Sequence, residues 1–106
     1  MCRSIMLSKR GQATISQCPD CKMLNVWQHN LLLNFTPEQF KAFKTFTSGI
    51  EEADAMFPFP DGEDRFVLRT PNSDICFTFS LTEWEDLMAA MEEAEYMQSV
   101  YQILHQ

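Results

Sequence analysis

The sequence predicts an α+β domain in which two strand–strand–helix units share one mostly antiparallel sheet, with both helices on one face and a β-hairpin at the N-terminus. Three observations predict this class: two stretches of the chain resemble each other, apolar residues alternate as in strands, and each apolar strand runs into a helix-start signal. With 106 residues, 45% of them hydrophobic, residues 1–106 are expected to form a single domain with one core.

The internal similarity emerges when the chain is compared with itself at an offset of 44 residues. The segment LLLNFTPEQFKAF, starting at Leu31, aligns with ICFTFSLTEWEDL, starting at Ile75. Each contains a capping box, in which a hydroxyl accepts from the third helical N–H and the third side chain reaches back. Each segment is therefore predicted to be a strand leading directly into a helix. The aligned apolar pairs are Leu31 with Ile75, Leu33 with Phe77, Phe35 with Phe79, Phe40 with Trp84 and Phe43 with Leu87.

The remaining elements follow in order along the chain. Residues 1–22 are expected to form a hairpin that turns at Arg10 and Gly11 and ends in the segment Cys-Pro-Asp-Cys. The first unit spans residues 23–49, with MLNVWQ and the strand from Leu31 as its hairpin. A connection with a turn at Asp61 and Gly62 leads to the second unit, residues 65–106, which ends in an extended helix.

The two predicted helices differ in length. The first is expected to end at Gly49, with this glycine as a left-handed cap. The second continues toward the C-terminus, and its stripe of large apolar residues shifts by about 100° near residues 92–95. A bend at residues 92–95 would let one surface bury both stripes. Otherwise the tail folds back over the domain or contacts a second copy or a protein partner, through Met97, Val100, Tyr101 and Leu104.

Three cysteines are expected to meet at the N-terminal hairpin. If the hairpin turns between residues 10 and 11, Cys2 lies almost opposite Cys18. A Cys-x-x-Cys turn offers two thiolates to a tetrahedral zinc ion, and a neighbouring strand can supply a third. Cys2, Cys18 and Cys21 are therefore candidate zinc ligands, with no fourth ligand identified. His29 is excluded because eight residues of strand separate it from Cys21, which corresponds to roughly 26 Å.

The Cys-Pro-Asp-Cys turn has two other interpretations. In a cytoplasmic protein its thiols are expected to be reduced, so they are either ordinary turn residues or a redox pair. A redox pair at Cys18 and Cys21 would need a helix directly after the turn, because the helix dipole lowers the pKa of the first thiol. The residues after Cys21 alternate like strands instead. Cys76 is expected in the middle of a strand as a small, inert apolar residue.

The net charge of −7 is divided unevenly between the halves of the chain. Residues 1–50 carry six Lys or Arg against two acids, a net of +4, whereas the rest carries two Arg against thirteen acids, a net of −11. Either the two fields offset each other within one fold, or the acidic half attracts a basic partner. Nucleic-acid binding is not expected, because Arg3, Lys9, Arg10 and Lys22, with Trp27, make a small footprint.

Targeting and catalytic motifs are not expected either. Three apolar residues in a row near the N-terminus are too few for a signal peptide, and no run approaches the roughly 20 residues of a membrane span, so a cytoplasmic location is expected. The chain has two histidines and lacks a Gly-rich phosphate loop or a Ser-His-acid set.

The segments CPDCKMLNVWQHNLLLNFTPEQFKAF and ICFTFSLTEWEDLMAAM follow a family pattern. The pattern is a Cys-x-x-Cys, an Asn, an apolar strand, and a helix with an early acidic residue and spaced phenylalanines. In these features the chain resembles a family of small uncharacterised bacterial proteins. The resemblance implies a domain of unknown function and no catalytic residues. The matching positions are Cys18, Cys21, Asn30, Leu31 to Phe35, Glu38, Phe40 and Phe43.

These observations favour a non-enzymatic binding or regulatory module, in which the zinc ion would have a structural role. A ligand groove between the two halves or self-association through the helical tail would both suit such a module. The competing class is a small thiol redox protein that uses Cys18 and Cys21.

Overall fold

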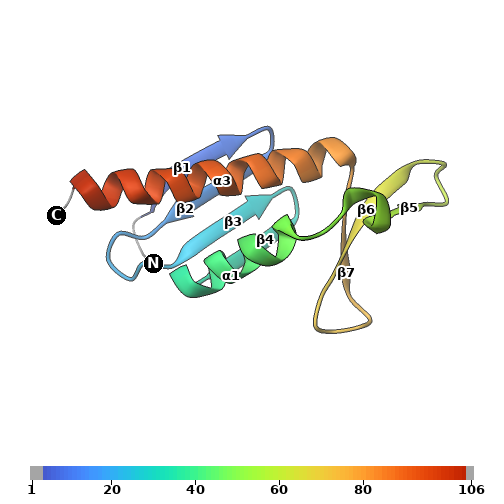
Figure 1. Ribbon diagram of the computed structural model, residues 1–106, viewed down its shortest axis with the longest axis horizontal. Coiled ribbons are helices and arrows are strands. Elements are labelled where there is room, and N and C mark those ends of the chain that lie inside the picture. The colour runs from blue at the N-terminus through green and yellow to red at the C-terminus, as the bar shows by residue number, and fades with distance from the viewer. Residues whose placement is uncertain (1–3, 105–106) are drawn as a thin grey trace.

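The computed structural model describes residues 4–104 and confirms the predicted α+β class. The first four strands form an antiparallel meander in which each strand pairs with the next (Figure 1). They are β1 (Ile5–Arg10), β2 (Ala13–Gln17), β3 (Leu24–Gln28) and β4 (Leu31–Phe35). The later elements are α1 (Pro37–Ser48), α2 (Glu52–Ala55), β5 (Met56–Pro58), β6 (Asp64–Arg69), β7 (Cys76–Phe79) and α3 (Leu81–Leu104).

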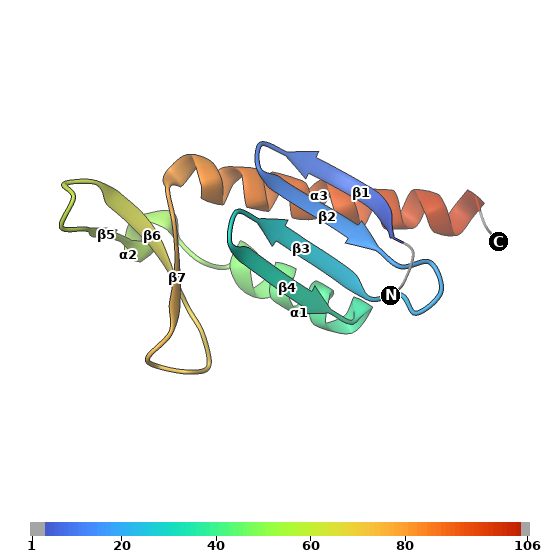
Figure 2. The same ribbon diagram turned by 180° about the vertical axis from the view of Figure 1, so that it is seen from behind.

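Helices α1 and α3 lie on the same face of the four-stranded sheet, as predicted (Figure 1). Figure 2 shows the opposite face, which no described helix or strand covers. Apolar residues of alternate strand positions, such as Ile15 and Val26, are fully buried between the sheet and the helices. On the uncovered face, the cross-strand partners Trp27 and Leu32 stay more than half exposed.

The prediction that both units share one sheet is wrong. Strands β5, β6 and β7 form a separate three-stranded antiparallel sheet beside the N-terminal end of α3 (Figure 2). The physical reason is that the N-terminal hairpin forms half of the four-stranded sheet. Strand β2 pairs with β3, and α3 makes most of its sheet contacts with β1 and β2. The hairpin therefore supplies the surface that the second unit was expected to provide.

Both predicted helix starts are confirmed in atomic detail. In the first capping box, Thr36 Oγ1 accepts from the Gln39 N–H at 3.1 Å and the Thr36 N–H donates to Gln39 Oε1 at 2.9 Å. In the second, Ser80 Oγ accepts from the Glu83 N–H at 3.1 Å and the Ser80 N–H donates to Glu83 Oε1 at 2.7 Å. The aromatic side chains that flank each cap also meet: Phe35 with Phe40, and Phe79 with Trp84.

The prediction of a left-handed cap at Gly49 is wrong. Its φ angle is −88°, in the right-handed region, and its N–H donates to the Phe46 carbonyl at 3.2 Å. The N–H of the next residue, Ile50, donates to the Thr47 carbonyl. The end of α1 is thus satisfied by a tight right-handed turn, which any residue can adopt.

The N-terminal hairpin turns at Gly11, which has a φ of +56°. Its register differs slightly from the predicted one: Ile5 pairs with Gln17, and an irregularity between Met6 and Ser8 shifts the later pairs by one residue. The buried Ser8 hydroxyl donates to the Ala90 carbonyl of α3 at 2.7 Å. The bulge therefore turns a polar side chain toward the helix and fixes the hairpin to it.

Replacing Gly11 with alanine is expected to lower the free energy of unfolding by about 1–3 kcal/mol, because an L side chain is strained at positive φ. The added Cβ would also overlap with Asp86 Oδ2, so the Asp86 side chain must rotate away. Gly49→Ala is the matched control and is expected to stabilise by about 0.4–1 kcal/mol, since its backbone is right-handed and the nearest atom is 3.6 Å from the new Cβ. Urea denaturation measures both, and equal effects would contradict the argument.

Helix α3 is continuous from Leu81 to Leu104, and both ribbon views show it without a kink, so the bend near residues 92–95, one of the alternatives left open by the sequence, is absent (Figures 1 and 2). Ala90 and Ala94, which a stripe of large apolar residues does not include, are fully buried. The alanines bring the helix close to β1 and β2 and join the two stripes into one. The buried or half-buried residues of this stripe are Trp84, Leu87, Met88, Ala90, Met91, Ala94, Met97 and Tyr101.

Candidate functional site

The Cys-Pro-Asp-Cys segment forms a tight turn between β2 and β3. The Cys18 N–H donates to the Met23 carbonyl at 3.0 Å, and the backbone N–H of Lys22 donates to the Cys18 carbonyl at 2.9 Å. Lys22 has a φ of 69°. The Cys18 side chain is buried and that of Cys21 is exposed. The Cys21 N–H donates to Cys18 Sγ at 3.4 Å. Hydrogen bonds of this kind orient thiolates that bind metals.

The third candidate ligand, Cys2, lies outside residues 4–104. Within this range, no three His, Cys, Asp or Glu side chains form a group that could hold a metal ion. Ile5 pairs with Gln17, directly before Cys18, so the chain enters β1 beside the turn. His29 follows the far end of β3, in agreement with its exclusion as a ligand. The zinc site stays a prediction.

The turn is followed by β3, which starts at Leu24, and not by a helix. The strand expected after Cys21 is thus confirmed. Without a helix N-terminus at the turn, the helix dipole cannot act on the Cys18 thiol, and the redox interpretation gains no support.

A cleft of about 440 Å³ lies between the β3–β4 turn and the three-stranded sheet. Both ribbon views show the β3–β4 turn directed toward β7 (Figures 1 and 2). One wall is the turn itself, residues 28–31, and the other is β7 with Arg65 of β6. Cys76, expected in mid-strand, is instead the exposed first residue of β7 and lines the cleft.

Glu83 of α3 holds the β3–β4 turn in place. Its Oε2 lies 2.9 Å from His29 Nε2, and its backbone carbonyl accepts from Gln28 Nε2 at 3.0 Å. Its other carboxylate oxygen belongs to the capping box with Ser80. His29 has a φ of 53°, a conformation that costs free energy for a residue with a side chain. Glu83, the third helical residue of the capping box, therefore stabilises a strained turn that lines the cleft.

Gln28 contributes an acceptor to the same wall. The residue is 3% exposed, and its Oε1 accepts no hydrogen bond from any residue in the range 4–104. A buried polar atom without a hydrogen-bond partner destabilises the fold, so Gln28 Oε1 accepts a hydrogen bond either from water or from a ligand.

Arg65 on the opposite wall is positioned by Asp61, four residues earlier. Arg65 Nη2 lies 2.7 Å from Asp61 Oδ2. The hydrogen bond from Arg65 lowers the pKa of the Asp61 carboxyl below its usual value, and the same contact raises the pKa of Arg65. This ion pair spans the β5–β6 turn and keeps a cation beside the cleft.

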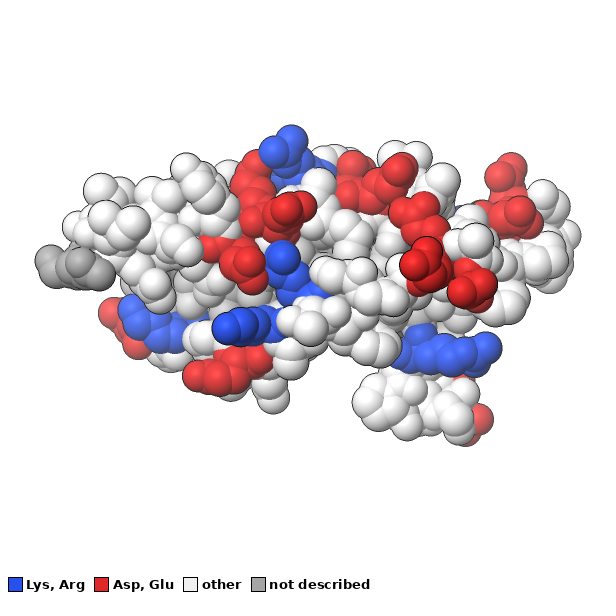
Figure 3. Space-filling view, in the orientation of Figure 1, with Lys and Arg blue, Asp and Glu red and all other residues white. Residues whose placement is uncertain are grey.

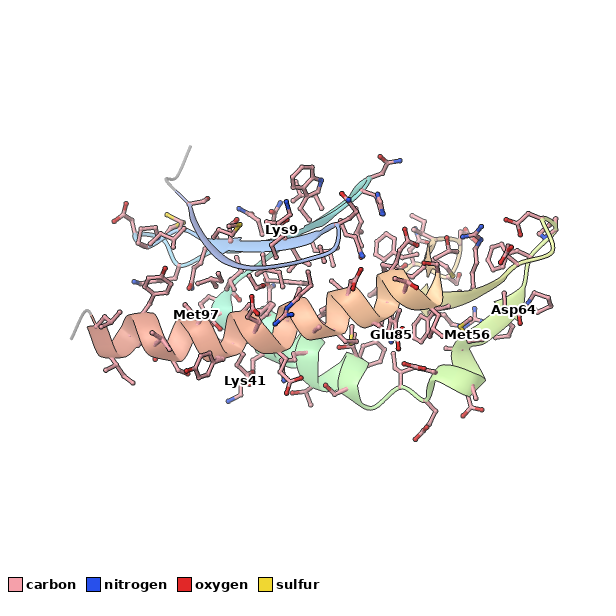
Figure 4. The ribbon with its side chains drawn as sticks, turned by 90° about the horizontal axis from the view of Figure 1, so that it is seen from above. Lys9, Lys41, Met56, Asp64, Glu85 and Met97 are labelled. Atoms are coloured by element: carbon pink, nitrogen blue, oxygen red, sulfur yellow. The ribbon has the colours of Figure 1, made fainter. Side chains whose placement is uncertain are left out.

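The predicted contact residues of the helical tail divide into two groups. Met97 and Tyr101 pack against the core, whereas Val100 is half-buried and Leu104 is 68% exposed. Figure 4 places Met97 at the opposite end of α3 from Met56 and Asp64 of the small sheet. The tail thus covers its own domain in part, and its outer side carries exposed Tyr96, Ile103 and Leu104.

The opposite charges of the two halves of the chain meet within the fold. Two acidic residues of α3 take part. Glu93 forms an ion pair with Arg10 of β1, and Glu95 Oε1 lies 3.6 Å from Lys44 Nζ of α1. These pairs support the interpretation that the halves offset each other. Figure 3 shows that acidic side chains nevertheless spread over α3, α2 and the adjacent hairpin, while the C-terminal end of α3 is uncharged on this face. No described helix is both long and apolar enough to cross a bilayer.

The sequence suggests a ligand groove between the two halves of the chain but gives neither its position nor its polar residues, Gln28, His29, Arg65 and Glu83. Of these four residues, the sequence singles out His29 alone, as an excluded zinc ligand, while Glu83 enters as the unnamed third helical residue of the second capping box. One signal was available, a histidine in a two-residue hairpin turn, where Gly, Asn and Asp are preferred. The position of this turn across the cleft from β7 depends on tertiary structure and has no sequence signal.

Comparison with protein families matches residues 1–105 to one family, described as "Family of unknown function (DUF6686)". The match includes the N-terminal hairpin as well as both units. No curated protein matches the chain, and no solved structure does. Because the match covers almost the whole chain, the protein belongs to the DUF6686 family of unknown function.

Proposed function

We propose that the chain is a non-enzymatic binding module whose ligand occupies the cleft between the β3–β4 turn and β7. The observation that carries this proposal is the cleft itself, about 440 Å³ in volume and bordered by two separate sheets. Sites for ligands form preferentially at such junctions and have sizes in this range.

Fixed polar groups support the proposal. His29 and Glu83 are held by each other, and Arg65 is held by Asp61, so these groups need little reordering when a ligand arrives. The buried Gln28 Oε1 offers an acceptor to a ligand donor. The strained His29 backbone is typical of binding sites, where such conformations are maintained by the surrounding structure.

Disulfide tethering at Cys76 tests the proposal directly, because this exposed thiol lines the cleft. A library of small disulfide-linked fragments is incubated with the protein under reducing competition, and mass spectrometry identifies fragments retained on Cys76. We expect a set of fragments to stay bound to Cys76 at a reductant concentration about tenfold higher than the concentration that releases them from a thiol elsewhere. This factor corresponds to about 1.4 kcal/mol of non-covalent binding.

The matched control is the double variant Cys76→Ser, Asn34→Cys, which moves the thiol to an exposed strand position on β4 outside the cleft. Retention of the same fragments by this double variant, or no selective retention at Cys76, would overturn the proposed binding site. Backbone amide shifts at residues 28–31 on tethering would locate the fragment against the opposite wall.

The proposal also includes a structural zinc ion held by Cys2, Cys18 and Cys21. The N–H that donates to the buried Cys18 Sγ supports it, since such hydrogen bonds orient metal-binding thiolates. A fourth ligand would complete the tetrahedral coordination of structural zinc. The ion would join the start of β1 to the β2–β3 turn and stabilise the sheet edge.

Three sequence-based expectations stay predictions. They are the cytoplasmic location, the bacterial origin, and an interaction with a second copy or partner through the helical tail. The exposed Leu104 and half-buried Val100 are the predicted tail contacts that are available to a partner.

A further inference from the structure

Strand β7 is an edge strand, and its outer edge borders the cleft. Among residues 4–104, its one strand partner is β6 in the three-stranded sheet. The cleft is lined by all four residues of the strand, Cys76 to Phe79. Because alternate residues of a strand point to opposite faces, contact with four consecutive residues places the cleft along the edge of the strand. The backbone groups of that edge face the cleft.

Two of the other edge strands have features that prevent a further strand from pairing with them. Strand β1 has a bulge and carries Lys9 and Arg10, and β5 has three residues and ends at Pro58. Charges, bulges, prolines and short length all prevent an edge from accepting another strand. Strands β4 and β7 carry no charged residue, bulge or proline, and β7 is the one that borders the cleft along its entire length.

We propose that the cleft receives an extended polypeptide segment of net positive charge, which adds to the three-stranded sheet as a new strand beside β7. This inference rests on the proposed function and names its ligand class. A polypeptide in extended form is the ligand that satisfies a row of backbone N–H and carbonyl groups. Its charge follows from residues 51–80, which carry seven acidic side chains against Arg65 and Arg69, a net of −5. Arg65 lines the cleft, but its charge is offset by the ion pair with Asp61.

The side chains around the edge are arranged for such a strand. The turn residues 28–31 form the wall opposite β7, so a strand in the cleft would lie between the two. The Gln28 Oε1 acceptor and the Glu83 carboxylate belong to that wall and can receive N–H donors of basic side chains. The exposed Ile75, directly before β7, extends the contact surface for apolar side chains.

A phage-displayed library of random twelve-residue peptides, selected on the full chain, provides the probe. Each backbone N–H of the tightest peptide is then methylated in turn. Strand addition predicts that methylation weakens binding about five- to tenfold at alternate residues and little at those between, because only every second N–H of an added strand faces β7. Selected peptides should be rich in Lys and Arg, and their affinity should fall as salt is raised.

Two further measurements separate the alternatives. A protein carrying a tethered fragment on Cys76 should no longer bind the peptide, whereas the double variant carrying the same fragment on its relocated thiol should bind it. Loss of binding without the alternating pattern, or the absence of any selected peptide, overturns the inference. If fragments are nevertheless retained at Cys76, the proposed function stands and only its ligand class is wrong. A concentration-dependent dimer with protected β7 amides would identify a second copy as the occupant and would also overturn it.

Discussion

Replacing Trp84 with alanine is expected to lower the free energy of unfolding by about 3–5 kcal/mol. Trp84 is 2% exposed and stacks on Phe66 with a centroid distance of 3.7 Å. It also contacts Phe79, so one side chain of α3 holds both β6 and β7. Removing it leaves a cavity at the junction of the two sheets. Chemical denaturation measures the loss.

The chain contains its own control for this experiment. Trp27 is 56% exposed, with its indole N–H donating to the His29 carbonyl at 2.9 Å. Trp27→Ala is therefore expected to cost less than about 1 kcal/mol. Hydrogen exchange should show that Trp84→Ala exposes the amides of β6 and β7 before those of β2 and β3. Equal losses in the two variants, or uniform exposure, would contradict a junction built on Trp84.

Loss of the Cys21 thiol is expected to remove one zinc ion per chain and to lower the free energy of unfolding by about 4 kcal/mol when free zinc is about 1,000 times its dissociation constant. A metal that binds only the folded chain stabilises it by its binding free energy. Cys21 is exposed, so Cys21→Ser disturbs little packing and isolates the metal contribution. Elemental mass spectrometry on protein purified without chelator or metal affinity resin gives the zinc content.

Two variants serve as controls for the zinc site. Cys76→Ser should keep both zinc and stability, because Cys76 belongs to the cleft and not to the hairpin. Cys2→Ser should behave as Cys21→Ser does if Cys2 is the third ligand. If the protein is free of zinc as purified, and equally stable with serine at position 21, the zinc site is contradicted and the Cys-Pro-Asp-Cys segment is an ordinary turn.

The cleft and the zinc site would act on different parts of the molecule. The Cys18 turn joins β2 to β3, whereas the cleft begins at Gln28, at the other end of β3. A structural ion would therefore stabilise the meander without contacting a ligand. We expect Cys21→Ser to lower stability and to leave the fragment affinity at Cys76 unchanged at temperatures where the variant is folded.

The sequence by itself determined the local structure. The capping boxes at Thr36 and Ser80, the aromatic pairs around them and the turns at Gly11 and Asp61 are contained in a few neighbouring residues. Their energies depend on backbone geometry and contacts within one or two turns, so they can be predicted without knowledge of the remainder. The alternation of apolar residues likewise determined which faces of the strands are buried.

Only the tertiary structure decided how these pieces combine. Alternating strands specify a buried face but not a pairing partner, so the division into two sheets could not be predicted. Ala90 and Ala94 have little hydrophobicity of their own, and they became core residues because β1 and β2 approach the helix there. The cleft arises where Glu83 of one unit holds the turn of the other, across 55 residues of sequence. Such a site depends on long-range packing, which no local pattern encodes.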